Sequence, residues 1–181
     1  VVAGEHYPDD VGEHLLRLFK GRKHAHNPQV HAAFARGLLI IDSIHATRNE
    51  PRLQSRDELI QQAGFFGDLI GDFSQDVSLA SIAVLQAMAN SRDTVLAQTG
   101  SQLLQRFVFN PGRAGHDTAS VRLAQANVIS ALGGLRSGRA FTALRAILDT
   151  TGSVHGPEVR LQLARVAERA YANLIERQTS L

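Results

Sequence analysis

Apolar residues recur along this chain at intervals of three and four positions, which is the period of one face of an α-helix. One such stripe consists of Val121, Ala124, Val128, Ala131 and Leu135, and similar stripes occur in residues 141–148 and 159–174. No segment alternates apolar and polar residues with a period of two over a convincing length. The pattern therefore predicts an all-α fold.

Turn-forming and helix-capping residues divide this pattern into about eight predicted helices. Their ranges are roughly 9–20, 29–46, 56–72, 77–90, 94–109, 119–135, 139–150 and 157–177. Asp76 and Asp93 stand directly before predicted helices, and Ser120 stands directly before Val121 at the start of another. At that position a side-chain oxygen accepts hydrogen bonds from the first amide groups of a helix, so we expect these residues to be N-caps.

The predicted helices contain an internal repeat. When Val30, Val77, Val121 and Val159 are aligned, the last three units share a leucine two positions later and a valine seven positions later. These matching residues are Leu79, Leu123 and Leu161, followed by Val84, Val128 and Val166. Each unit reads as a helix, a turn and a second helix, and such a pair buries its apolar faces only by stacking against its neighbours.

Residues 117–135 begin with an acid, continue with Val121-Arg122 and spaced alanines, and end on Ala131-Leu132-Gly133-Gly134-Leu135. This segment resembles the opening helix of a HEAT repeat, and residues 138–149 are similar to the second helix. The resemblance is clearest over residues 117–175 and implies a short right-handed superhelix of stacked helical hairpins, HEAT- or armadillo-like. We expect residues 1–75 to form an N-terminal helical layer or cap and residues 76–181 to form the repeats, within one continuous domain or as two parts.

Composition excludes several classes of protein. The chain has no cysteine and no tryptophan, and aromatic residues make up 6% of it. A disulfide framework, a thiolate zinc site and a cysteine nucleophile are therefore excluded, and aromatic platforms for nucleic-acid bases are scarce. The longest strongly apolar run is residues 38–41, far short of the roughly 20 residues of a membrane-spanning helix. Because the sequence starts at Val1, we expect a processed chain or a piece of a longer one.

The net charge of +2 conceals an asymmetry, because residues 91–181 contain 11 arginines against 6 acidic residues. The planar guanidinium group of arginine presents forked N–H donors that match the geometry of carboxylates and phosphates. Candidate partner or phosphate contacts in this half are Arg122, Arg136, Arg139, Arg145, Arg160, Arg165 and Arg169. Arg122 and Arg160 occupy equivalent repeat positions, where they would form a ladder that joins repeats, with Asp117 and Glu158 as partners, or would contact phosphate.

Six histidines lie in the first 45 residues, namely His6, His14, His24, His26, His31 and His45. They form no His-Glu-x-x-His motif and no pair four positions apart, so we interpret them as surface residues and predict no metal site. His116-Asp117 is similar to the dyad of HD-type phosphohydrolases but fits a helix-capping acid better. Asp68 and Asp72 are interpreted as the solvated edge of an amphipathic helix rather than as a catalytic pair.

Taken together, these features predict a non-enzymatic helical-repeat scaffold that binds a protein or peptide partner and needs no cofactor. The inner faces of the second half are the expected binding surface. One alternative is nucleic-acid binding to the phosphate backbone through the arginine-rich C-terminal half. Another is a histidine-rich, metal-binding helical protein.

Overall fold

The computed structural model describes residues 7–21, 26–48, 55–72, 74–111, 118–135 and 142–146. It also describes single positions in the last part of the chain, namely 140, 161, 164, 165, 167–169, 171, 172, 175 and 176. All regular secondary structure in this described part is helical, and it contains no strand. The all-α prediction is therefore confirmed.

Six α-helices and one short 3₁₀ helix have defined bounds within the described ranges. They are α1 (Tyr7–Lys20), α2 (Pro28–Arg48), α3 (Arg56–Asp68), η1 (Leu69–Gly71), α4 (Gln75–Ala89), α5 (Thr94–Phe109) and α6 (Thr118–Gly133). The described residues of the predicted helices at 139–150 and 157–177 are helical as well. The predicted bounds agree with these elements to within two residues, except that the third helix tightens into η1 over its last turn.

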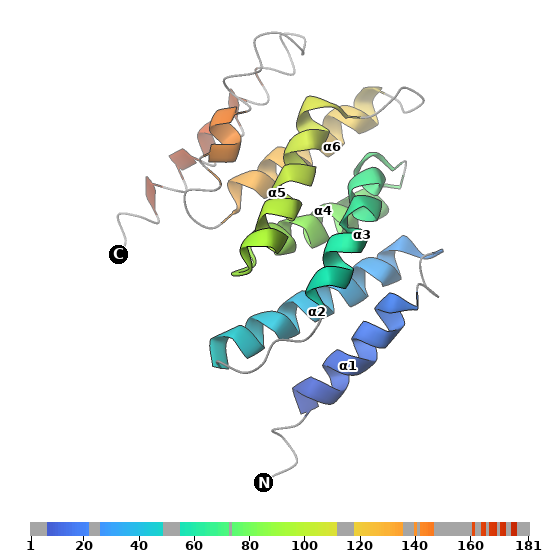
Figure 1. Ribbon diagram of the computed structural model, residues 1–181. Helices are drawn as coiled ribbons and strands as arrows, with labels where there is room; N and C mark the ends of the chain where they lie inside the picture. The colour runs from blue at the N-terminus through green and yellow to red at the C-terminus, as the bar shows by residue number, and fades with distance from the viewer. Residues whose placement is uncertain are drawn as a thin grey trace.

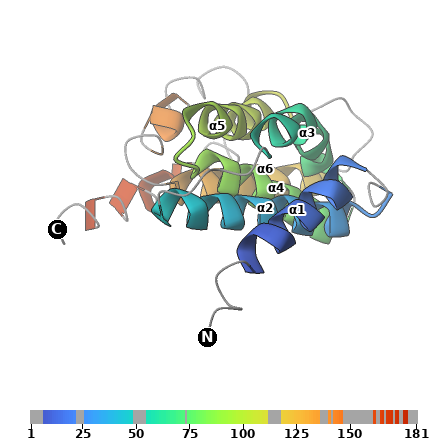
Figure 2. The same cartoon turned by 60° about the horizontal axis from the view of Figure 1, so that its bottom comes forward.

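The helices lie in two layers (Figures 1 and 2). α2, α4 and α6 pack side by side in what we call the first layer, with α1 against α2 at one end of the row. α3, η1 and α5 form the second layer. The described residues 142–146 continue the second layer, and those from 161 to 176 lie at the far end of the first (Figure 2).

The apolar core fills the space between the layers. Each helix from α2 to α6 contributes at least one fully buried side chain, namely Leu38, Phe66, Leu85, Leu104 and Leu132 in chain order. α4 is central, since it contacts α2, α3, α5 and α6. Contacts of α2 with α4 and of α3 with α5 cross residue 75, and the division of the chain at that residue stays a prediction.

Asp93 is the N-cap of α5, as predicted. Its Oδ1 accepts hydrogen bonds from the amides of Val95 at 2.9 Å and Leu96 at 3.0 Å. Its Oδ2 pairs with Nε of Arg56 at 3.2 Å, which ties the start of α5 to the start of α3. The other two predicted caps are wrong, because α4 and α6 begin one to two residues earlier and place Asp76 and Ser120 inside their first turns.

We expect Asp93→Ala to lower the free energy of unfolding by about 1 kcal/mol, because two amides of the first turn of α5 lose their acceptor. Urea denaturation followed by circular dichroism measures this as a lower midpoint. Asp93→Asn keeps a capping oxygen and serves as the control, with an expected change of only a few tenths of a kcal/mol. Equal losses in both variants would show that the charge pairing with Arg56, rather than the cap, stabilises this corner.

Candidate partner-binding surface

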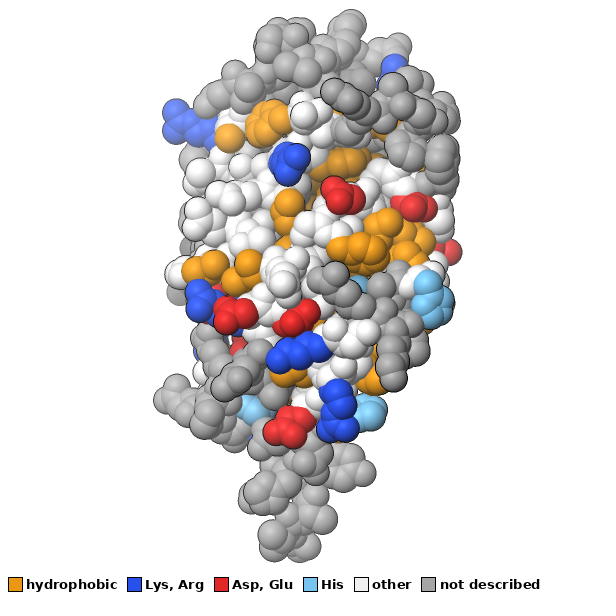
Figure 3. Space-filling model, turned by 45° about the vertical axis from the view of Figure 1, so that its right-hand side comes forward, with side chains coloured by type: hydrophobic (Ala, Val, Ile, Leu, Met, Phe, Trp, Pro, Cys, Tyr) orange, Lys and Arg blue, Asp and Glu red, His pale blue; other side chains and the backbone are white. Residues whose placement is uncertain are grey.

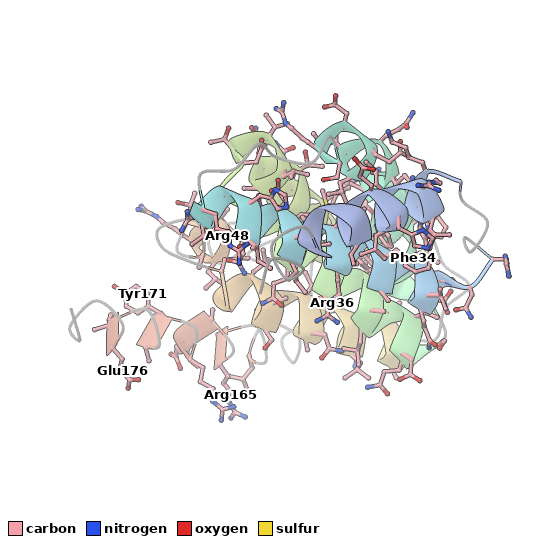
Figure 4. The ribbon with its side chains drawn as sticks, turned by 90° about the horizontal axis from the view of Figure 1, so that it is seen from below. Phe34, Arg36, Arg48, Arg165, Tyr171 and Glu176 are labelled. Atoms are coloured by element: carbon pink, nitrogen blue, oxygen red, sulfur yellow. The ribbon has the colours of Figure 1, made fainter. Side chains whose placement is uncertain are left out.

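The structure places four of the seven predicted arginine contacts. Arg122 on α6, Arg145 in residues 142–146, and Arg165 and Arg169 near the C-terminus all have exposed side chains. Arg165 projects away from the body of the molecule in Figure 4. Arg145 belongs to the second layer and the other three to the first, so the structure divides the set between two faces. Arg136, Arg139 and Arg160 lie outside the described residues, as do Asp117 and Glu158 of the predicted ladder.

The described histidines do not converge on a common point. His31 and His45 are buried at opposite ends of α2, and 14 helical positions separate them by about 21 Å. His14 and His26 are exposed. No group of three or more metal-ligating side chains exists among the described residues. His6, His24 and His116 fall outside that part of the chain.

His31 belongs to an aromatic cluster that joins the first three helices. Its ring stacks on Phe19 at a centroid distance of 4.6 Å and on Phe66 at 5.6 Å, and meets the edge of Phe65. Nε2 of His31 lies 2.6 Å from Oε1 of Gln62, and Gln62 donates through Nε2 to the carbonyl oxygen of Phe19 and to Glu58. These contacts hold α1, α2 and α3 together. Interpreting His31 and His45 as surface residues was wrong, since both are buried. The spacing of His31 from Ala35 and Leu38 on one helical face was a usable signal.

Asp68 and Asp72 do not form a shared site. Asp72 follows η1, and its Oδ1 accepts a hydrogen bond from the amide of Ser74 at 2.8 Å, which closes a turn before α4. Two glycines beside them allow close packing, because a Cβ would lie 3.2 Å from Leu103 at Gly67 and 3.4 Å from Phe107 at Gly71. The interpretation of this segment as structural agrees with these contacts.

Exposed large apolar side chains gather on the first layer. Seven of the nine among the described residues belong to it, namely Ile40, Ile44, Leu79, Leu123, Leu161, Tyr171 and Ile175. Val11 lies on α1, and Val95 lies on α5 of the second layer. Exposed apolar side chains that adjoin one another, as Ile40 and Ile44 do one helical turn apart, are typical of a face that contacts another molecule.

The three leucines of the internal repeat are part of this exposed set. Leu79 is 41% exposed, Leu123 47% and Leu161 57%. In contrast, the repeated valines Val84 and Val128 are fully buried. The repeat therefore contains one position that fills the core and a second position that presents leucine to solvent from successive helices of the first layer.

A groove lies between α2 and the end of α4 on the first layer. Its volume is about 430 Å³, and its apolar wall includes Ile40 and Ile44 of α2 and Ala87 of α4. Asn90, Ser91 and Arg92, which follow α4, also line it, and Nη1 of Arg92 donates to the carbonyl oxygen of Ala46 at 3.4 Å. Ile40 is 58% exposed, so the groove is open along its rim.

On the side of the molecule shown in Figure 3, acidic and basic side chains are interspersed between separate apolar patches. The described side chains on that side form no extended surface of one charge sign, which a backbone of phosphates would require.

No protein family, no curated protein and no solved structure matches this chain in sequence or fold comparison. Among the described residues, no helix combines the length and apolarity needed to cross a bilayer.

Proposed function

We propose that this chain is a HEAT-like helical-repeat scaffold, a short superhelix of stacked helical hairpins, that binds a protein partner through its first layer and carries out no catalysis. The observation that carries the proposal is the row of exposed leucines Leu79, Leu123 and Leu161 at one repeat position. A leucine that recurs at equivalent positions of the internal repeat but is exposed contributes little to the core. It gains free energy when a partner covers it.

The packing of the helices supports the repeat interpretation. Odd and even helices from α2 to α6 separate into the two layers, as stacked helical hairpins require (Figure 2). In the α2–α4 groove, residues 39–47 face residues 87–92. This offset agrees with the 47 residues between Val30 and Val77 in the sequence alignment. Leu123 and Leu161 belong to the second half of the chain, and Leu79 extends the row of exposed leucines to α4.

The test is affinity capture from native lysate with two variants of the tagged protein. We expect the double variant Leu79→Asn with Leu123→Asn to retain about ten-fold less of the stoichiometric partner than the unchanged chain. Val95→Asn is the matched control, because Val95 is 40% exposed but lies on the second layer. All three proteins should melt within a few degrees of one another, since surface substitutions change stability by only about 0.5 kcal/mol. Equal partner recovery in the double variant and the control would refute the first-layer proposal.

Nucleic-acid binding is the second candidate, and the exposed guanidinium groups of Arg122, Arg165 and Arg169 on the first layer favour it. Treating half of each lysate with nuclease separates the two candidates. Loss of all captured material after nuclease treatment would support phosphate contacts by these arginines. Retention of protein partners supports the scaffold.

A further inference from the structure

The α2–α4 groove has the features of a docking site for a partner helix, and this inference rests on the proposed function. Two aliphatic side chains, Ile40 at 58% and Ile44 at 37% exposure, stand one helical turn apart on its rim. Ala87 of the neighbouring helix forms part of the opposite wall and leaves room because its side chain is small. Partner helices with apolar residues at three- and four-residue spacing bind in grooves of this kind.

The charged residues described at the groove differ in exposure. Asp42 is the acidic residue in the lining, and it is only 8% exposed. The described basic residues at the groove are exposed: Arg92 in the α4–α5 turn, and Arg48, which follows the lining residue Thr47 at the end of α2 (Figure 4). A guanidinium group has five N–H donors, so the bond from Arg92 to Ala46 leaves it able to bind a carboxylate.

We infer that the α2–α4 groove binds an acidic amphipathic helix of a protein partner. The apolar side chains of the partner helix pack against Ile40, Ile44 and Ala87. The carboxylates of the partner helix face Arg48 and Arg92. An Arg–carboxylate pair of this type adds orientation as well as affinity, because the planar guanidinium group binds the carboxylate through two parallel hydrogen bonds. Complementary charge at the rim also accelerates the encounter, and this contribution weakens as salt is added.

The test is selection of a displayed library of random 15-residue peptides on the full chain, followed by fluorescence polarisation with the most enriched peptide. We expect enriched sequences to have apolar residues three and four positions apart with aspartate or glutamate beside them. Ile40→Asn with Ile44→Asn should weaken the selected peptide at least about ten-fold. Arg48→Glu with Arg92→Glu should weaken it by a similar factor and remove most of its salt dependence.

Matched controls are Val95→Asn and Arg106→Glu, which change an exposed apolar and an exposed basic side chain on α5. Both should leave the affinity of the selected peptide within two-fold of the unchanged chain. The inference is wrong if no peptide is enriched, if enriched peptides are basic, or if the groove variants bind as well as the controls. Such a failure is distinct from failure of the scaffold proposal, because partner capture that depends on Leu79 and Leu123 can persist when the groove variants have no effect.

Discussion

Replacing Gly100 by alanine should lower the free energy of unfolding by about 3 kcal/mol, the upper part of the range for overpacking a well-filled core. Gly100 is buried on α5, where α5 packs against α4. A Cβ at this position would lie 2.5 Å from the carbonyl oxygen of Leu85 and 2.7 Å from the amide nitrogen of Ala89. Both atoms belong to the backbone of α4, so no side-chain rotation relieves the contact. The two helices must move apart, and the core between the layers must repack.

Thermal unfolding followed by circular dichroism measures this effect. For a chain of this length, a loss of about 3 kcal/mol corresponds to a melting temperature lower by roughly 6–12 °C. Gly64→Ala is the control, because Gly64 lies on an exposed face of α3, where a Cβ would meet no side chain and no other helix within 4 Å. There the substitution should raise stability by about 0.4–1 kcal/mol through the entropy of the unfolded chain. Equal melting temperatures for Gly100→Ala and the unchanged chain would show that α4 and α5 are not in the close contact described.

The helices themselves were largely predictable from the sequence. The three- and four-residue spacing marks one face of a helix wherever a helix packs on a core, and Asp93 caps α5 through atoms only two and three residues away. Local signals of this kind need no knowledge of the fold. Gly100 shows the limit, because its role depends on the backbone of α4, and a glycine within a helical pattern carries no sign of its neighbour.

Burial was less predictable than helicity. Leu79 and Val84 both recur in the internal repeat, yet Leu79 is 41% exposed and Val84 is fully buried. The sequence shows that leucine and valine recur at these two positions. The placement of α2 and α6 beside α4 decides which of the two positions faces the core. His31 shows the same limit for a polar residue, because this histidine, which was expected at the surface, is only 1% exposed.

The candidate site could be predicted only in outline. The arginines of the second half are visible in the sequence, and Arg122, Arg165 and Arg169 are indeed exposed, but Arg145 lies on the other layer. The groove joins Ile40 to Arg92, which are far apart in the chain, and no spacing rule connects them. Ile40 also belongs to the most apolar run of the sequence, residues 38–41, where helical periodicity alone does not distinguish a rim residue from its buried neighbours.

Gln62 connects three helices through one buried amide, and its replacement by leucine has the second large expected effect. Its Oε1 faces Nε2 of His31, and its Nε2 donates to the carbonyl oxygen of Phe19 in the last turn of α1. The last four carbonyl groups of a helix have no partner within that helix, so Gln62 satisfies one of them from α3. Leucine has a similar size but no polar atoms. We expect Gln62→Leu to cost about 2 kcal/mol, because two buried polar groups lose a partner at once.

Urea denaturation tests this expectation, with Gln61→Leu as the control. Gln61 is the neighbouring residue on α3 and is exposed, so its replacement should change the unfolding free energy by no more than about 0.5 kcal/mol. The double variant His31→Phe with Gln62→Leu separates hydrogen bonding from packing. Replacing both partners by apolar groups removes the unsatisfied imidazole nitrogen, and a third phenyl ring can stack where His31 lies between Phe19 and Phe66. We therefore expect the double variant to be more stable than Gln62→Leu alone. If it is less stable, the cluster depends on the shape of the imidazole ring, and the hydrogen bond between His31 and Gln62 is not what joins α2 to α3.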